Sequence, residues 1–95
     1  MRRDEALAKL RDLKPWLESH GITRTRVYGS HARDTAHAQS DMDLIVDFAR
    51  TPDLWTFAGL QEDLSRLLGV PVDLTTERGL HKKLKAQILA SAVDA

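Results

Sequence analysis

The segment Val27–Phe48 (VYGSHARDTAHAQSDMDLIVDF) constrains the fold most, because its residue types and spacing require a particular local structure. Tyr28 ends an extended run, and Gly29 supplies the backbone freedom that a tight turn needs. Ser30 is a favourable N-cap for a short helix over residues 31–35. The segment therefore predicts a strand, a Gly-Ser turn, a short helix, a polar loop and a second strand.

The predicted turn at Gly29 and Ser30 has the properties of an anion site. Its backbone N–H groups point outward, and the positive end of a helix dipole lies behind them. Gly29 has no side chain to keep a phosphate away. We therefore expect this turn to bind a polyphosphate.

Two carboxylates, Asp41 and Asp43, follow Ser30 at the start of the β-rich run Leu44–Val46. Residues i and i+2 of a strand share a face and lie roughly 6 to 7 Å apart along the chain. Two carboxylates in that arrangement repel each other unless a cation lies between them. Carboxylate oxygens together with a bound phosphate are ligands that Mg²⁺ prefers, so the pair predicts a magnesium site.

A third carboxylate, Asp73, lies in the predicted strand at residues 70–75, where it alternates with Val72 and Leu74. If this strand pairs beside the strand that carries Asp43, the third carboxylate joins the other two. A phosphate-binding turn with three carboxylates is the layout of two-metal phosphoryl or nucleotidyl transfer.

The remaining pattern predicts helices around a small sheet. Residues 3–19 have helical periodicity that Pro15 should kink or divide, and residues 22–28 form a strand. A helix begins at Thr51-Pro52-Asp53, with Thr51 as its cap and Leu54 on its apolar face, and ends at Gly69. A last helix covers residues 80–93, with Leu84 and Ile88 facing inward. We expect an α/β (α+β) fold with a small mixed three-stranded sheet covered by helices.

Length and composition restrict the class of protein. The 95 residues predict a single domain over residues 1–95, with 42% hydrophobic and 29% charged residues. The chain has no apolar run of membrane-spanning length and no apolar signal core, and it has no cysteines. These features favour a cytoplasmic protein without membrane contact.

The charge balance argues against a dedicated nucleic-acid-binding protein. Lys and Arg number 14, and Asp and Glu also number 14, so the chain lacks an overall basic field. We expect no direct binding to nucleic acid.

Two sequence blocks together carry a resemblance to a known family. They are Gly29-Ser30 followed by Ser40–Leu44 (SDMDL), and Leu68–Leu74 (LGVPVDL). With these residues the chain resembles the minimal nucleotidyltransferases of the DNA polymerase beta superfamily, and most of all the short MNT-type antitoxins that are paired with HEPN-type toxins. The resemblance covers nearly the whole chain and implies the polymerase-beta-like nucleotidyltransferase fold.

The resemblance also implies a reaction. A nucleotidyltransferase of this kind uses Mg²⁺ to transfer a nucleoside monophosphate from an NTP to a hydroxyl. In the members that this chain resembles most, AMP from ATP is added to a tyrosine of the cognate HEPN ribonuclease toxin, which silences it. The expected partners are therefore ATP and a HEPN toxin.

Site residues follow from the same resemblance. Gly29 and Ser30 would hold the β- and γ-phosphates, and Arg33 would contact the triphosphate unless it pairs with Asp34 on a helix surface. The carboxylates Asp41 and Asp43 would bridge two Mg²⁺ ions. Asp73 would complete one metal site and accept the proton of the attacking hydroxyl. The catalytic and metal-binding residues implied are thus Asp41, Asp43 and Asp73.

Other interpretations of the same residues remain open. Asp34 stands where the family usually has glycine, so an alternative is a non-catalytic antitoxin that neutralises its toxin by binding. Transfer to a small molecule is a third possibility, but relatives that do this carry a further acceptor-binding domain. His31 and His37 are expected to be solvated loop residues, because their spacing matches no imidazole metal motif.

Overall fold

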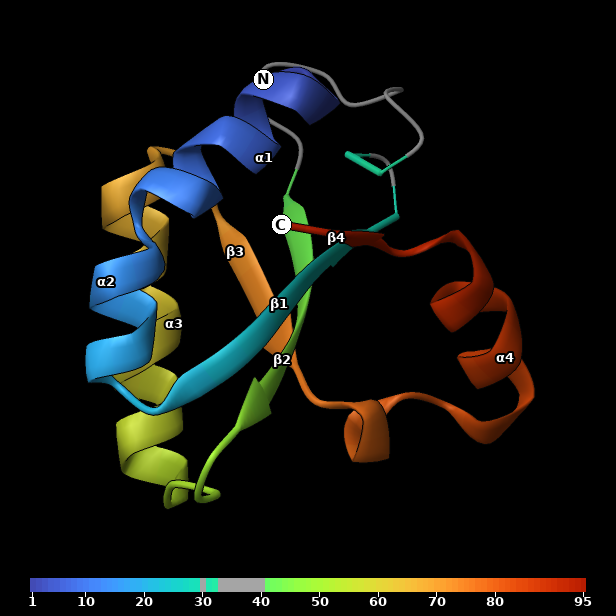
Figure 1. The fold of residues 1–95 in the computed structure, drawn as a ribbon. Helices are drawn as coiled ribbons and strands as arrows, with labels where there is room; N and C mark the ends of the chain where they lie inside the picture. Colours follow the sequence, from blue (N-terminus) through green and yellow to red (C-terminus); the bar gives the residue numbers. More distant parts are fainter. Residues whose placement is uncertain (30, 33–40) are drawn as a thin grey trace.

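The computed structural model describes residues 1–29, 31–32 and 41–95 (Figure 1). The strands are β1 (Ile22–Tyr28), β2 (Met42–Phe48), β3 (Val72–Thr75) and β4 (Val93–Asp94). The helices are α1 (Arg3–Asp12), α2 (Lys14–Ser19), α3 (Leu54–Leu68), α4 (Lys82–Ser91) and the 3-10 turn η1 (Glu77–Gly79). The short helix predicted at residues 31–35 lies mostly outside the described residues, which place residues 31–32 in a turn.

The strands form one mixed sheet in the order β3-β2-β1-β4. β1 runs antiparallel to β2 with Tyr28 opposite Asp43, and β4 runs antiparallel to β1. β2 and β3 are parallel, with Asp43 opposite Asp73. Parallel neighbours need a crossover connection, and α3 supplies it. The expected α+β class with a mixed sheet is confirmed.

The predicted number of strands was wrong, because β4 adds a fourth. We expected the last helix to extend to residue 93, but α4 ends at Ser91 and Val93 lies opposite Val27 of β1. The backbone N–H of Ala95 also donates to the carbonyl of Thr25 at 3.0 Å. A strand of two residues has no sequence periodicity of its own, so only its partner strand reveals it.

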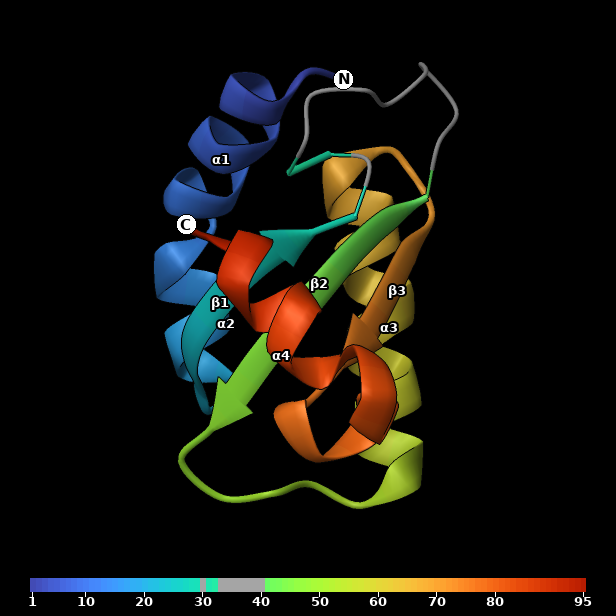
Figure 2. The same ribbon diagram turned by 90° about the vertical axis from the view of Figure 1, so that its right-hand side faces the viewer.

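Helices α1, α2 and α3 cover one face of the sheet (Figures 1 and 2). The predicted break at Pro15 is confirmed, because it lies in the first turn of α2, directly after α1 ends. The apolar side chains of the three helices pack against alternate strand residues. The main members of this core are Leu7, Leu10, Leu17, Val27, Leu44, Val46, Leu60, Leu64, Leu68 and Leu74.

Helix α3 begins later than predicted. Its N-cap is Asp53, whose carboxylate accepts a hydrogen bond of 2.8 Å from the backbone N–H of Thr56, rather than Thr51. The first helical residue, Leu54, was expected in the core but is 85% exposed, and Trp55 beside it is 88% exposed. The helix ends as predicted at Gly69, which has φ 74°.

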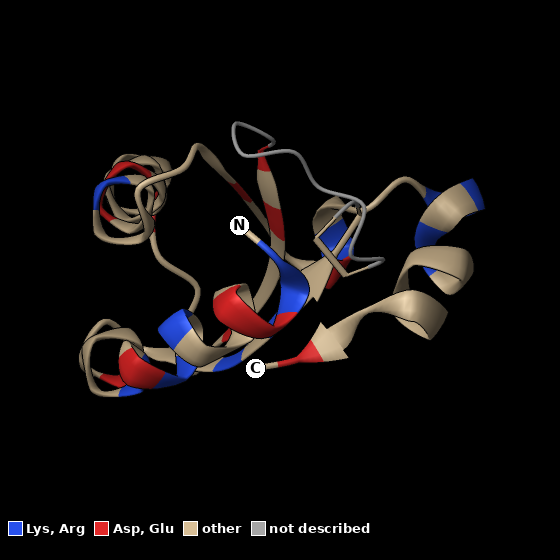
Figure 3. Ribbon diagram, turned by 90° about the horizontal axis from the view of Figure 1, so that it is seen from above, with Lys and Arg blue, Asp and Glu red and all other residues tan. Residues whose placement is uncertain are grey.

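Helix α4 lies over the opposite face of the sheet from α1, α2 and α3 (Figures 1 and 2). It has no buried residue, and Leu84, expected to face inward, is half exposed. The predicted inward residue Ile88 is only partly buried. Basic residues gather in the first part of this helix (Figure 3). None of the described helices combines the length and the apolar character needed to cross a membrane.

Side chains of α3 accept hydrogen bonds from backbone N–H groups on the outer edge of β3, which is a terminal strand of the sheet. The Ser65 hydroxyl accepts a hydrogen bond of 3.0 Å from the Val72 N–H, and the Gln61 side-chain carbonyl accepts one of 2.8 Å from the Leu74 N–H. Residues 61 and 65 lie one helical turn apart, so they match donors on alternate residues of the strand. The edge is thereby closed to other strands, and β3 is fixed to α3.

We predict that Gln61→Ala destabilises the protein by about 1 to 3 kcal/mol, because the buried N–H of Leu74 would lose its acceptor. Urea unfolding followed by circular dichroism measures this change. The matched control is Gln87→Ala at an exposed position of α4, which should change stability by less than about 0.5 kcal/mol. Equal effects of the two substitutions would show that the Gln61 hydrogen bond does not hold β3.

Candidate functional site

The sheet face that α1, α2 and α3 leave uncovered carries the predicted site residues; we call it the open face. Side chains alternate along each strand, so Val27, Leu44 and Leu74 point into the core. Their neighbours Tyr28, Asp43 and Asp73 therefore share the open face.

The carboxylates of Asp43 and Asp73 stand side by side on this face. The two residues are register partners in the parallel pair β2 and β3, and neighbouring strands lie about 4.8 Å apart. The strand pairing on which the third carboxylate depended is thus confirmed. Asp43 is partly buried, whereas Asp73 and Asp41 are exposed, and Asp41 lies directly before β2. Like charges directly opposite each other destabilise a sheet. The stability of the sheet therefore does not explain why this pair is present.

Gly29 brings the turn that we expect to bind phosphate close to one of these carboxylates. Its φ is 72°, in the left-handed region that glycine adopts without strain. A Cβ at this position would lie 2.5 Å from Oδ2 of Asp43. Glycine is therefore required both by the turn and by the carboxylate next to it. The turn and the Asp43 side chain meet at one point, as the proposed chemistry needs.

Two predicted nucleotide contacts, Ser30 and Arg33, lie outside the described residues, as does His37. Within residues 1–29, 31–32 and 41–95, no three Asp, Glu, His or Cys side chains form a ready-made metal site. Mg²⁺ is usually held by one or two carboxylates together with substrate phosphates and water, rather than by an all-protein cage. The donor set of Asp41, Asp43 and Asp73 fits an ion that is bound together with a nucleotide.

Tyr28 is a site residue that the sequence analysis did not assign. It is the chain's one tyrosine, it is partly buried, and it lies opposite Asp43 in β1. Burial raises the pKa of its phenol, and the nearby charges of Asp43 and Asp73 raise it further, because all three disfavour the phenolate. The protonated hydroxyl is a hydrogen-bond donor at the edge of the carboxylate pair. The available signal was its place directly before Gly29, at the end of the strand that leads into the predicted turn.

His31 is buried, so the expectation of a solvated loop histidine was wrong. Its side chain is fully covered, and neither ring nitrogen has a hydrogen-bond partner among the described residues. Burial lowers the pKa of the imidazole, and the charge of the N-terminus lowers it further, while the nearby backbone of Asp41 acts in the opposite direction. The ring is therefore neutral near pH 7.

Asp47 lies at the far end of the open face, outside the carboxylate group. It lines a pocket of about 340 Å³ together with Phe48, Thr51 and residues 76–78. This pocket contains none of the three predicted metal ligands. Its rim includes Glu77, which belongs to a separate polar network at that end of the sheet.

Comparison with known proteins agrees with this geometry. Residues 4–95 match the family model described as a nucleotidyltransferase domain. The protein adenylyltransferase MntA of Thermococcus cleftensis is 37% identical over 76 residues, which are 80% of this chain and 77% of that protein.

Two solved structures have the same fold. One is described as a minimal nucleotidyltransferase, with a TM-score of 0.80 and 39% identity over 98% of this chain and 95% of the other. The second is a toxin-antitoxin complex with AMP-PNP, with a TM-score of 0.69 and 26% identity over 99% of this chain and 72% of that chain.

We predict that Gly29→Ala destabilises the protein and abolishes its activity at the open face. The left-handed φ costs about 1 to 2 kcal/mol for a residue with a Cβ, and the contact with Asp43 adds displacement of the carboxylate. The control Gly69→Ala has φ 74° but no atom within 4 Å of the added Cβ. Chemical unfolding should show a lower free energy of unfolding in both variants, whereas ligand binding should be lost in Gly29→Ala alone. Equal binding by both variants would contradict the assigned role of the Asp43 contact.

We predict that Asp73→Asn lowers the pKa of Tyr28, because one of the two charges that oppose the phenolate is removed. The near-ultraviolet absorbance of the phenolate measures this pKa directly, since the chain has one tyrosine. Asp12→Asn, at an exposed carboxylate at the end of α1, is the control and should leave the titration unchanged. An unchanged titration in Asp73→Asn would mean that the two side chains are not neighbours in solution.

Proposed function

The chain belongs to the nucleotidyltransferase domain family, and we propose that it transfers AMP from ATP to a tyrosine hydroxyl of a HEPN ribonuclease toxin, which neutralises the toxin. The observation that carries this proposal is the meeting of Gly29 with the register pair of Asp43 and Asp73. A phosphate-binding turn beside adjacent carboxylates is an arrangement that serves nucleotidyl transfer.

The proposed residue roles follow from their places on the open face. The backbone at Gly29 and Ser30 would hold the β- and γ-phosphates, with Arg33 beside them. The carboxylates Asp41 and Asp43 would hold two Mg²⁺ ions, and Asp73 would complete one of the two sites. When bound, the ions would neutralise charge on the phosphates and make the acceptor hydroxyl more acidic.

The transfer would be an in-line displacement at the α-phosphorus of ATP. The acceptor oxygen forms a bond to this phosphorus, the bond to the β-phosphate oxygen breaks, and pyrophosphate leaves. Asp73 is the proposed acceptor of the hydroxyl proton, because it is exposed and lies beside Asp43. Asp43 is less accessible, which suits a residue that holds a metal rather than one that exchanges a proton with a substrate.

A second candidate function is neutralisation of the toxin by binding alone. One observation favours it: Leu54 and Trp55 expose adjacent apolar side chains. Exposed tryptophans are frequent centres of protein interfaces. The two candidates differ in one property, because only the catalytic one requires the carboxylates.

We predict that the purified protein, incubated with Mg²⁺ and α-labelled ATP, transfers label to a purified HEPN toxin. Asp41→Asn and Asp43→Asn should each lower labelling by at least about 100-fold, because each removes a charged group from the reacting centre. Asp12→Asn, an exposed carboxylate remote from the site, is the matched control and should label the toxin at the wild-type rate. Chelation of Mg²⁺ should stop labelling in every variant.

The same variants are then tested for neutralisation of the toxin's ribonuclease activity. Loss of neutralisation together with labelling supports catalysis. Neutralisation that survives in Asp41→Asn without labelling would replace the catalytic proposal with the binding one. Mass spectrometry of the labelled toxin identifies the acceptor residue, and a label on any residue other than tyrosine would correct that part of the proposal.

A further inference from the structure

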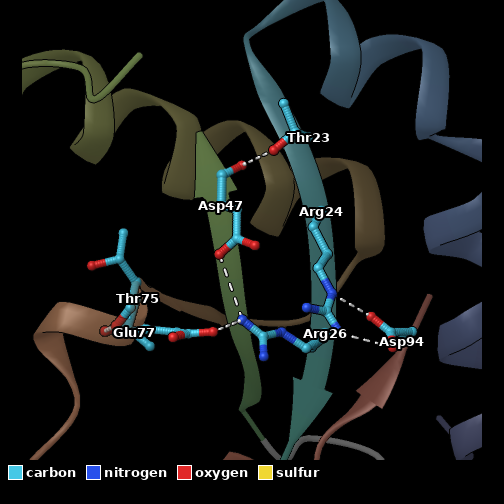
Figure 4. A network of polar contacts seen from close by, with 8 residues as sticks. Thr23, Arg24, Arg26, Asp47, Thr75, Glu77 and Asp94 are labelled. Atoms are coloured by element: carbon cyan, nitrogen blue, oxygen red, sulfur yellow. Dashed lines mark hydrogen bonds and ion pairs between the residues drawn. The ribbon is translucent and has the colours of Figure 1, made fainter. Parts of the chain in front are cut away.

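A network of ion pairs connects β1 to the elements on either side of α4 (Figure 4). Nη2 of Arg26 donates to Oε1 of Glu77 at 2.6 Å and to Oδ1 of Asp47 at 3.5 Å. Two residues earlier, Nε and Nη2 of Arg24 donate to the two carboxylate oxygens of Asp94 at 2.8 and 3.1 Å. Both arginines lie on the open face, since i and i+2 of a strand share a face.

These two pairs hold α4 by its ends. Glu77 begins η1, the element that precedes α4, and Asp94 belongs to β4, which follows it. Between them α4 buries no residue, and Ile88 and Leu89 are only partly covered. Its position over the open face is therefore determined by its attachments more than by packing.

The two attachments are not equivalent. At the β4 end, backbone pairing of Val93 with Val27 and the hydrogen bond from Ala95 to Thr25 hold the chain even without Arg24. The Arg24 side chain is about half exposed, and exposed pairs contribute little. At the η1 end, by contrast, the Arg26 side chain is 7% exposed. Arg26 is thus the main polar link at that end.

Burial of Arg26 is hard to explain by stability. Its Nε has no hydrogen-bond partner in the described part of the chain, and a buried ion pair is often replaced by apolar residues without loss of stability. The pKa of Glu77 is lowered by its hydrogen bond with Arg26 and by the charge of the same residue, so the pair is ionised at neutral pH. The arginine fixes a position rather than filling space.

That position bears on the carboxylate site. Arg26 precedes Tyr28 by two residues on the same face, and Glu77 follows Asp73 by four residues along the chain. The far end of α4 is carried by β4 to Val27, next to the turn at Gly29. Helix α4 therefore lies on the sheet face that holds the carboxylates, and the chain leaves it for β4 close to the turn at Gly29 (Figures 1 and 2).

We propose that Arg26 is a positioning residue for nucleotide binding: through Glu77 it fixes η1 and α4 over the open face and so sets the wall of the nucleotide site. The inference rests on the proposed function only in taking ATP as the ligand. Arg26 touches no reacting atom in this role. Its removal is expected to weaken nucleotide binding more than it changes the chemical step.

The test variant is Arg26→Met, which keeps an apolar side chain of similar length in the buried space. Glu77 and Asp47 are 40% and 39% exposed, so water can solvate them when the arginine is gone. The fold should therefore persist, with Tm within about 5 °C of wild type. Amide hydrogen exchange of residues 82–91 should be about tenfold faster, because α4 loses one attachment.

Titration calorimetry with Mg²⁺ and ATP provides the second readout. Arg26→Met should raise the Kd for ATP about tenfold, since a displaced wall misaligns the ligand. Arg24→Met is the matched control from the same strand and face, and its Kd and exchange rates should stay within about twofold of wild type. Arg26→Lys retains the charge, and one ammonium can replace the single Nη2 contact with Glu77, so it should restore most of the affinity.

Each result is decisive without a transfer assay. Unchanged exchange in α4, or faster exchange with an unchanged Kd, overturns the positioning role. Equal loss of affinity in Arg24→Met and Arg26→Met would also overturn it, because it would assign the effect to general loosening. If wild-type protein binds ATP but transfers no AMP, the proposed function is refuted. The positioning role of Arg26 is then still tested by comparing the Kd values of the variants. Wild-type protein that does not bind ATP refutes both.

Discussion

The parallel pairing of β2 with β3 places Asp73 beside Asp43, and much of the remaining fold makes this pairing possible. Parallel neighbours cannot be joined by a tight turn, so the chain needs the fifteen-residue crossover α3. The crossover begins at the Asp53 cap and ends at Gly69. Its side chains also satisfy outer N–H groups of β3. An unfavourable contact between like charges is therefore held in place by a helix that buries Leu60, Leu64 and Leu68 against the sheet.

The pairing register of β2 determines which of its side chains face the core and which lie on the open face. Because side chains alternate with a period of two, a slip of β2 by one residue would move Asp43 into the core and expose Leu44. Burial of an apolar side chain contributes about 1.5 to 3 kcal/mol, and an unpaired buried carboxylate costs more than that. The burial of Met42, Leu44 and Val46 in the core therefore opposes such a slip more strongly than the repulsion between Asp43 and Asp73 favours one.

The features that depend on residues close together in the sequence could be predicted from the sequence alone. Gly29 was recognisable because a strand ends there, and Asp43 and Asp73 because a polar residue interrupts each apolar strand. The break at Pro15 follows from proline stereochemistry alone. The parallel pairing itself was only a condition of the prediction, since no local pattern specifies which strands become neighbours.

Features that depend on distant partners were not predictable in the same way. β4 is two residues long and exists because β1 has a free edge there. The burial of His31 depends on what covers it, and nothing in its immediate neighbours indicates that. Arg26 and Glu77 lie 51 residues apart in the chain, and each looks like an ordinary surface charge in the sequence. The start of α3 was misplaced because both Thr51 and Asp53 are good caps, and the choice between them is made by tertiary contacts.

The open face also separates two kinds of charge along one strand. At one end, Tyr28 of β1 and the following residue Gly29 lie beside Asp43. Negative charge accumulates there, so a cation with a nucleotide is the natural complement. Two residues away, roughly 6 to 7 Å along the strand, Arg26 already has its own acidic partners. Because Glu77 and Asp47 engage this arginine, it does not neutralise the carboxylates at the other end. A face that placed Arg26 against Asp43 would be more stable without a ligand, but it would bind a metal and a nucleotide less well. The local pairing of Arg26 thus keeps this arginine away from the carboxylates on which the proposed chemistry depends.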